Sequence, residues 1–329
     1  MCSGVGGLDL AVERVFGART VWFSEPDPSA SLVLDTHWPG VKNHGDLTAV
    51  GWNSVEPVNI LTAGYPCQPF SHAGLHGGEN DPRHLWPHIR ASLDVLRPWM
   101  VVLENVQGHV KRGLPEVLAD LDDAGYGARW MTLNASDVGA PHRRTRVFVL
   151  ASRSWRGTLR LHHRTPREDK LLPTLRSRDH AGAGIHGRGG HDLRTTLGML
   201  FPTPLARDSK GLSAPGRSGP PGLVDVLQPA DALRDYRPAL QLWKTITGRE
   251  HPYPVEPASR GDRVRVNPRF SEWMMGWPEG WVDVGIPFTH QTRLIGNGVV
   301  DRQAEAALHV LMDGGTDSSS PATGTDGTN

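Results

Sequence analysis

Short β-rich runs and segments with helical spacing alternate along residues 4–150 of this 329-residue chain. Strand-like runs fall at residues 20–24, 58–63, 99–103, 129–133 and 147–150. Helical spacing of apolar residues falls at residues 8–16, 85–96 and 114–121. This alternation predicts an α/β fold with a doubly wound sheet. Because such sheets bind ligands at the carboxyl ends of their strands, the residues that follow each strand are the first candidates for a site.

The regular pattern stops near Ser152 and returns at about residue 268. We therefore expect a catalytic domain over residues 1–151 and a smaller, irregular domain over residues 152–267. Residues 268–312 would return to the first domain, with a short helix at 270–275 and a glycine turn at 294–299 that opens a last helix. Residues 313–329 are mostly Gly, Ser, Thr and Asp, which is typical of a disordered tail.

The net charge of zero hides an uneven distribution. Residues 151–270 hold 21 Lys and Arg against 11 Asp and Glu, whereas the rest of the chain holds 14 against 24. A basic segment joined to an acidic body favours a polyanion-binding module, although an arginine-rich solvated surface would look the same.

The composition also bears on the cellular compartment in which the protein works. No run approaches 18 apolar residues, and the first residues lack the basic and apolar regions of a signal peptide. Two cysteines cannot build a disulfide framework. A cytoplasmic protein with no membrane partner fits these observations.

Cys67 stands between two prolines, Pro66 and Pro69, directly after the strand expected at 58–63. Proline fixes φ and donates no backbone hydrogen bond, so this thiol lies on a stiff loop at a strand end. A lone cysteine is more often buried and inert. Its place here favours a nucleophile, provided that its neighbours lower its pKa.

A glycine turn, Gly4-Val5-Gly6-Gly7, opens the first expected helix, and such a turn lets the backbone approach a nucleotide-like ligand. Glu25 and Asp46 each follow a β-rich run or turn, and a strand-end acid can bind a ribose diol. Taken alone, the turn is more often only a tight turn and the acids are more often surface carboxylates.

Glu104 directly follows the clearest strand of the chain, residues 99–103, and so belongs to the same sheet edge as Cys67. It could equally cap the next element. Arg144 and Arg146 lead into the strand at 147–150. Alternate residues of a strand share a face, so we expect these two guanidinium groups to point together.

In this order the motifs resemble those of the cytosine-C5 DNA methyltransferases. The resemblance covers residues 1–150 and 268–312 and consists of Cys2-Ser3-Gly4-Val5-Gly6-Gly7, Glu25, Asp46, Tyr65-Pro66-Cys67-Gln68 with Phe70-Ser71, Glu104-Asn105-Val106, Arg144 and Arg146, Met275-Gly276-Trp277-Pro278, and Gly296-Asn297-Gly298-Val299.

The resemblance implies a methyltransferase fold, S-adenosylmethionine as cofactor, double-stranded DNA as partner and no metal ion. Cys67 would add to C6 of a flipped cytosine under a closing loop at 74–83, Glu104 would bind the N3/N4 edge, and Arg144 and Arg146 would hold the O2 side and a neighbouring phosphate. The implied cofactor site comprises Cys2, Gly4, Val5, Gly6, Gly7, Glu25, Pro26, Asp46, Leu47, Pro66, Leu85, Asn297 and Val299.

Three departures from the family pattern bear on the fold and the site. Only three residues precede the glycine turn, where the family has an apolar strand, so we expect the true start to lie upstream or the sequence to be truncated. Cys2 stands in place of Phe, which removes an aromatic side from the adenine pocket. His142 replaces Gln, a change that we expect to be tolerated.

Other functions stay open at this point. An RNA methyltransferase acting on tRNA would share these motifs, and a non-catalytic DNA-binding relic would explain a missing strand. A Rossmann dehydrogenase gives the motif around Cys67 no role. The long basic segment favours duplex DNA, because a recognition domain is needed to read a major groove. We expect the protein to act in restriction-modification or phage DNA protection. We also expect a cognate restriction endonuclease as a possible partner and a monomeric state.

Overall fold

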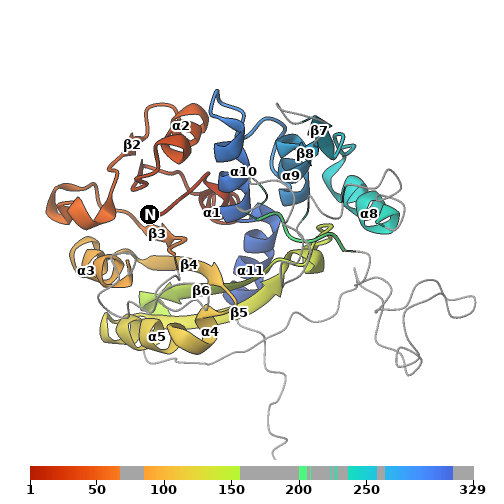
Figure 1. The fold of residues 1–329 in the computed structure, drawn as a ribbon. Coiled ribbons are helices and arrows are strands. Elements are labelled where there is room, and N and C mark those ends of the chain that lie inside the picture. The colour runs from red at the N-terminus through yellow and green to blue at the C-terminus, as the bar shows by residue number, and fades with distance from the viewer. Residues whose placement is uncertain are drawn as a thin grey trace, which may run out of the picture.

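The computed structural model describes residues 1–66, 85–155, 200–205, 208, 223, 227, 236–257 and 264–313. Cys67, the loop at 74–83, most of the expected recognition domain and the tail after residue 313 lie outside the described residues. The described part is an α/β fold, as the sequence predicts (Figure 1).

Six strands form the main body. Four make one sheet in the order β3 (Ile60–Ala63), β4 (Met100–Val106), β6 (Thr145–Ser152) and β5 (Gly127–Asn134). β3 and β4 are parallel, whereas β6 is antiparallel to both of its neighbours. A separate parallel pair consists of β1 (Trp22–Phe23) and β2 (Lys42–Asn43). The antiparallel pair β7 (Val255–Pro257) and β8 (Val264–Val266) lies apart from both (Figure 1).

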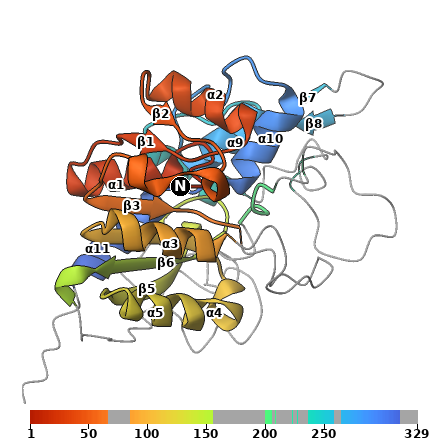
Figure 2. The ribbon, with the colours of Figure 1, turned by 90° about the vertical axis from the view of Figure 1, so that its left-hand side faces the viewer.

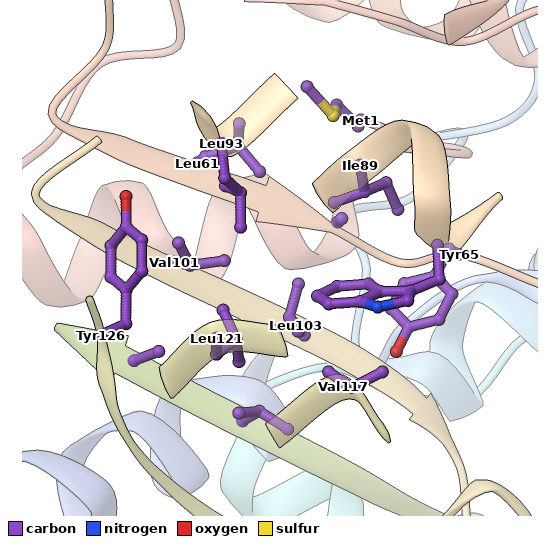
Figure 3. Packing of buried hydrophobic residues seen from close by; sticks show 14 of the residues in the cluster. Met1, Leu61, Tyr65, Ile89, Leu93, Val101, Leu103, Val117, Leu121 and Tyr126 are labelled. Carbon is purple, nitrogen blue, oxygen red and sulfur yellow. The ribbon is translucent and has the colours of Figure 1, made fainter. Parts of the chain in front are cut away.

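Helices cover both faces of the four-stranded sheet (Figure 1). On one face, α3 (Trp86–Leu96) and α5 (Leu114–Asp123) pack on alternate β4 residues, Val101 and Leu103. On the other face, α1 (Gly7–Phe16) and α11 (Asp301–Asp313) pack on Val102 between them. The alternation along β4 therefore gives a sheet buried on both sides. Figure 3 shows the first of these two cores, in which Met1 lies beside Leu61 and the α3 residues Ile89 and Leu93.

The ends of several helices follow from local sequence. Gly17 adopts a φ of 60° after α1, and Arg97 ends α3 directly before Pro98. Asp27 caps α2 (Pro28–His37) by accepting the N–H groups of Ser29 and Ala30. Short elements complete this half: α4 (His109–Arg112), and the 3₁₀ turns η1 (Leu47–Ala49), η2 (Trp52–Ser54), η5 (Ala135–Val138) and η6 (Arg153–Trp155).

The C-terminal helices and the loops between them contact the first glycine turn and α1. α8 (Arg237–Thr247) packs against α9 (Pro268–Met275), and the indole N–H of Trp243 donates to the carbonyl of Trp273 at 2.6 Å. The α11 carboxylate of Asp301 pairs with Arg14 of α1 at 2.6 Å. Two helices from opposite ends of the sequence, α1 and α11, therefore share one core.

Met1 and Cys2 lie between β1 and β3 (Figures 1 and 2). The Met1 amine donates to Thr62 O at 2.7 Å, and Cys2 N–H donates to Ser24 O at 2.9 Å. These residues connect the two sheets.

Three local predictions are wrong. Glu104 lies inside β4 rather than after it. Residues 294–297 end a helix that the sequence did not reveal, α10 (Phe288–Asn297), and the turn begins only at Gly298. Arg144 precedes β6 with a φ of 31°, so the alternation argument does not apply to it. In the described part of the chain, no helix is both long and apolar enough to cross a membrane.

Candidate active site

The glycine turn before α1 is held by a carboxylate. The backbone N–H of Gly4 donates to Glu25 Oε2 at 2.9 Å, and Asp27 N–H donates to Oε1 at 3.0 Å. Gly4 and Gly6 have φ values of 55° and 83°, which non-glycine residues rarely adopt. The Glu25 carboxylate, which follows β1, therefore holds the glycine turn in place.

Asn43 joins the Glu25 loop to the Asp46 loop. Its Oδ1 accepts the N–H groups of Glu25 and Gly45, and its amide donates to Glu25 O and Ser31 Oγ. No local pattern marks Asn43, because its role depends on the pairing of β1 with β2. It brings both predicted acids to one edge.

Asp46 is exposed and accepts Thr48 N–H at 2.9 Å through Oδ1 alone. This bond lowers the pKa of the Asp46 carboxyl. Leu47, next in η1, is buried beneath it, whereas Pro26 beside Glu25 is exposed. The arrangement leaves Asp46 Oδ2 open to a ligand from solvent.

Cys2 lies between the two acids. Burial raises the pKa of its thiol to about 12, and the charges of Glu25 and Asp46 act in the same direction. The side chain is therefore a neutral, half-buried thiol at neutral pH. It can fill space beside a ligand, but it cannot act as a nucleophile.

The C-terminal segment closes on the glycine turn at van der Waals distance. A Cβ added at Gly7 would lie 2.4 Å from the carbonyl oxygen of Val299. That oxygen accepts the indole N–H of Trp277 at 3.0 Å, and the carbonyl of Val5 accepts that of Trp281 at 2.9 Å. The family positions Val5, Gly7 and Val299 thus meet in one place. Asn297 lies exposed at the end of α10.

Glu104 is the buried acid of the sheet edge. It is 8% exposed, and its Oε1 accepts the Nε–H of Arg146 at 3.0 Å. Burial raises the pKa of the Glu104 carboxyl, while the charges of Arg146 and Arg144 oppose the rise. A Cβ at Gly64 would come within 3.7 Å of Glu104 Oε2, so the end of β3 passes close to the carboxylate.

The loop that leads to Cys67 is anchored at its first residues. Gly64 N–H donates to Met1 O at 3.3 Å, and the amide of Asn105 donates to Tyr65 O at 3.0 Å. The Tyr65 hydroxyl lies 2.9 Å from Nε2 of His109, a buried ring whose pKa burial lowers to about 4. Pro66 is exposed at the end of this anchored segment. Cys67 itself lies outside the described residues. The described chain stops at Pro66, two residues after Gly64, which passes close to Glu104.

Arg144 has a different environment from that of Arg146. Its guanidinium is 2% exposed and donates to three backbone carbonyls, those of Pro204, Gly296 and Gly298. Burial lowers the pKa of Arg144, and Arg146 lowers it further. Arg144 thus fastens the segment before Val299 to the start of β6.

His142 is fully buried, and its Nε2–H donates to Met274 O at 3.1 Å. Burial lowers its pKa to about 3, so the ring is neutral at physiological pH. It supports α9 at some remove from the acids.

The turn has the features that a nucleoside cofactor requires. Nothing lies within 4 Å of a Cβ added at Gly4, and the buried Oγ of Ser3 has no partner among the described residues. Each Glu25 oxygen accepts one N–H and keeps a lone pair for a ribose hydroxyl. With Asp46 beside them, these groups fit S-adenosylmethionine. Leu85, half-buried before α3, was also predicted to contact the cofactor. Within the described ranges, no group of three or more His, Cys, Asp or Glu side chains could hold a metal ion.

Sequence reasoning missed Asn43 and His109, and it named Ser3 and Trp277 only as members of motifs, without a role of their own. Asn43, His109 and Trp277 act through contacts between distant segments, so no local spacing marks those contacts. Gly113 gives the clearest hint of His109, because a Cβ there would lie 2.5 Å from the imidazole ring.

Known proteins match this arrangement. The family model described as C-5 cytosine-specific DNA methylase matches residues 1–180. The type II methyltransferase M.NlaX of Neisseria lactamica is 38% identical over 154 residues, which are 45% of this chain and 49% of that protein. M.MspI of Moraxella is 34% identical over 155 residues, 45% of this chain and 37% of that protein. The chain thus spans about half the length of these curated relatives, or less.

A solved structure supports the fold. The crystal structure of a Spodoptera frugiperda DNMT2 mutant superimposes with a TM-score of 0.56 at 18% identity. The match covers 94% of this chain and 97% of that chain. Since the family model alone matches more than half of the sequence, the chain belongs to the C-5 cytosine-specific DNA methylase family.

Proposed function

We propose that this chain is a DNA (cytosine-5-)-methyltransferase that transfers a methyl group from S-adenosylmethionine to a flipped cytosine in double-stranded DNA. The observation that carries the proposal is the buried pair of Glu104 and Arg146 beside the anchored residues Tyr65–Pro66. The two side chains hold each other in place without a ligand.

Cys67 is the proposed nucleophile. Its thiolate forms a bond to C6 of the cytosine, and the ring electrons move to C5, which becomes able to attack a methyl group. After C5 gains the methyl group, the C5 proton leaves to solvent and the sulfur–C6 bond breaks. The cytosine must leave the duplex for this chemistry, and the loop at 74–83 is the proposed cover.

Glu104 is the proposed partner of the N3/N4 edge. A carboxyl group whose pKa is raised by burial can keep a proton and share it with N3 as negative charge develops on the ring. Arg146 holds this carboxyl in place through Oε1 and leaves Oε2 for the base. Arg144 is proposed to act indirectly, because its donors already meet backbone carbonyls.

When bound, S-adenosylmethionine supplies an electrophilic methyl group on sulfur. Glu25 would accept the ribose hydroxyls, Asp46 the adenine amine, and the turn of Gly4 would face the rest of the molecule. Val299 would close the site from the C-terminal side. The remaining predicted cofactor contacts stay part of the proposal: Cys2, Val5, Gly6, Gly7, Pro26, Leu47, Pro66, Leu85 and Asn297.

The rest of the chain fits this function. Residues 152–267 are proposed as the target-recognition domain, set between a catalytic domain at 1–151 and the returning segment at 268–312, with a tail at 313–329. Its surplus of Lys and Arg would neutralise DNA phosphates. A cytoplasmic monomer in a restriction-modification setting, with a cognate endonuclease, extends the proposal, because the curated relatives are named type II methyltransferases.

Covalent trapping tests the chemistry. Fluorine at C5 cannot leave as a proton does, so duplex DNA containing 5-fluorocytosine should remain bound to the chain through Cys67 when S-adenosylmethionine is present. Cys67→Ser should give no adduct yet bind the cofactor normally. Glu104→Gln should slow adduct formation by roughly 10²–10⁴-fold.

Two outcomes would contradict the proposal. Absence of an adduct with any nucleic acid would favour a non-catalytic DNA-binding protein. An adduct with tRNA in place of DNA would make the chain an RNA methyltransferase. Bisulfite sequencing of DNA from cells that express the chain would then report the target sequence.

A further inference from the structure

The two carboxylate oxygens of Glu25 are held by backbone donors from two different segments. Oε2 accepts Gly4 N–H at 2.9 Å, and Oε1 accepts Asp27 N–H at 3.0 Å. The first donor belongs to the glycine turn, whereas the second belongs to the residue that caps α2. The direction of the lone pairs that Glu25 keeps for a ligand therefore depends on the position of Asp27.

Helix α10 contacts the start of α2 through two side chains, and Figure 2 shows the two helices beside each other. The guanidinium of Arg293 pairs with Asp27 Oδ2 at 2.7 Å, and a hydrogen bond of 2.7 Å joins His290 Nδ1 to Ser29 Oγ. Although burial alone would raise it, the pKa of the Asp27 carboxyl is lowered, by Arg293 first and then by backbone N–H groups of α2. Asp27 is therefore ionised at neutral pH, where its ion pair with Arg293 is fully formed.

The Asp27 carboxylate divides its two oxygens between a local and a distant contact. Oδ1 accepts the N–H groups of Ser29 and Ala30 and so caps α2 within three residues of chain. Oδ2 meets Arg293, which comes from the opposite end of the sequence. Removal of the Arg293 charge would therefore release the second oxygen and leave the cap of α2 in place.

The other end of α2 is held by the same C-terminal segment. His37, in the last turn of α2, stacks on the ring of Trp281 with centroids 3.6 Å apart and an angle of 1° between the planes. The Nε2–H of His37 donates to Trp281 O at 2.7 Å, and the indole N–H of Trp281 donates to Val5 O at 2.9 Å. Residues 281–293 thus fix both ends of α2 and contact the glycine turn as well.

We propose that Arg293 is a positioning residue for the ribose of the cofactor. Together with His290 it holds the start of α2, and the N–H of Asp27 then sets the Glu25 carboxylate against the glycine turn. This inference rests on the proposed function, because it takes Glu25 as the acceptor of the ribose hydroxyls. Arg293 acts through Asp27 and not on the reacting groups, so it should affect cofactor affinity more than the rate of methyl transfer.

Arg293→Gln tests the proposal, because it removes the charge and keeps much of the side-chain length. Its dissociation constant for S-adenosylhomocysteine, measured by isothermal titration calorimetry, should rise by about 3- to 10-fold. Its kcat at saturating S-adenosylmethionine should stay within about 2-fold of the original. Arg293→Lys keeps a cation near Asp27 and should restore most of the affinity. The matched control is Arg269→Gln, which breaks two exposed ion pairs of the same segment, those with Glu279 and Asp283, and should change neither value.

A double-mutant cycle separates an effect through Glu25 from a general loss of structure. In a Glu25→Gln background, Arg293→Gln should change the dissociation constant by less than about 2-fold, because the group through which it acts is already altered. The same fold-change in both backgrounds would overturn the proposal, since Arg293 would then act by another route. An unchanged dissociation constant in the original background would overturn it as well.

Hydrogen exchange of the cofactor-free chain, followed by mass spectrometry, gives a readout that does not depend on the proposed function. The amides of Gly4 and Asp27 both donate to Glu25, and they should exchange at least about 3-fold faster in Arg293→Gln than in the original chain or in Arg269→Gln. Unchanged exchange would overturn the proposal, whether or not the chain methylates DNA. Failure of the original chain to bind S-adenosylhomocysteine would instead contradict the proposed function, and the exchange rates alone would then decide whether α10 positions Glu25.

Discussion

Glu272 gives the sharpest prediction of pH dependence. It is 1% exposed, and its two oxygens accept the N–H groups of Gly280 and Val282 at 3.0 and 2.7 Å. The loop after α9 carries Trp277 and Trp281, whose indole N–H groups donate to Val299 O and to Val5 O of the glycine turn. The charge state of Glu272 therefore bears on both stability and the site.

The sign follows from the pKa. Burial raises the pKa of the Glu272 carboxyl from 4.5 to about 7, although the two N–H donors act against the rise. Between these values the folded chain holds a proton that the unfolded chain has released, so stability falls as the pH rises from 4.5 to 7 and is constant above that window. The difference between the two pKa values corresponds to a loss of about 3 kcal/mol.

Glu272→Gln removes the titrating group and serves as the reference. Urea unfolding of both proteins, followed by tryptophan fluorescence from pH 5 to 8.5, should show the free-energy difference between them change by about 2–3 kcal/mol in favour of the variant as the pH rises. Glu279→Gln, at an exposed carboxylate of the same loop, is the matched control and should show little change. A pH-independent difference for Glu272→Gln would refute the reasoning.

Three further substitutions test other contacts. Gly7→Ala would push a methyl group against Val299 O and should destabilise the fold by roughly 1–3 kcal/mol, whereas Gly51→Ala, whose added carbon meets only one atom at 3.8 Å, should be neutral in the same urea titration. Arg144→Lys cannot reach three carbonyls and should cost roughly 1.5–3 kcal/mol in that assay. His142→Gln keeps a neutral donor for α9, so its unfolding free energy should differ by less than about 1 kcal/mol from pH 5 to 8; a larger loss would give the imidazole a role of its own.

Local sequence rules explain the elements that were predicted correctly. Helices α1 and α3 end where Gly17 and Pro98 require, and β3 lies within the apolar run that precedes Gly64. α10 was missed because its two apolar residues near the C-terminal end, Leu294 and Ile295, stand next to Gly296, and the glycine suggested a turn. The antiparallel direction of β6 was also not predicted, since strand direction is set by the path of the chain and not by local composition.

The site residues also divide into those that local motifs reveal and those whose roles only the fold reveals. The sequence motifs located Glu25, Asp46 and Glu104, because acids in or just after β-rich runs are visible in a pattern of strands. They did not distinguish Arg146, which holds Glu104, from Arg144, which holds backbone carbonyls from two other segments. That distinction depends on where β6 begins. β6 begins at Thr145, and Arg144 just before it donates to carbonyls far along the chain.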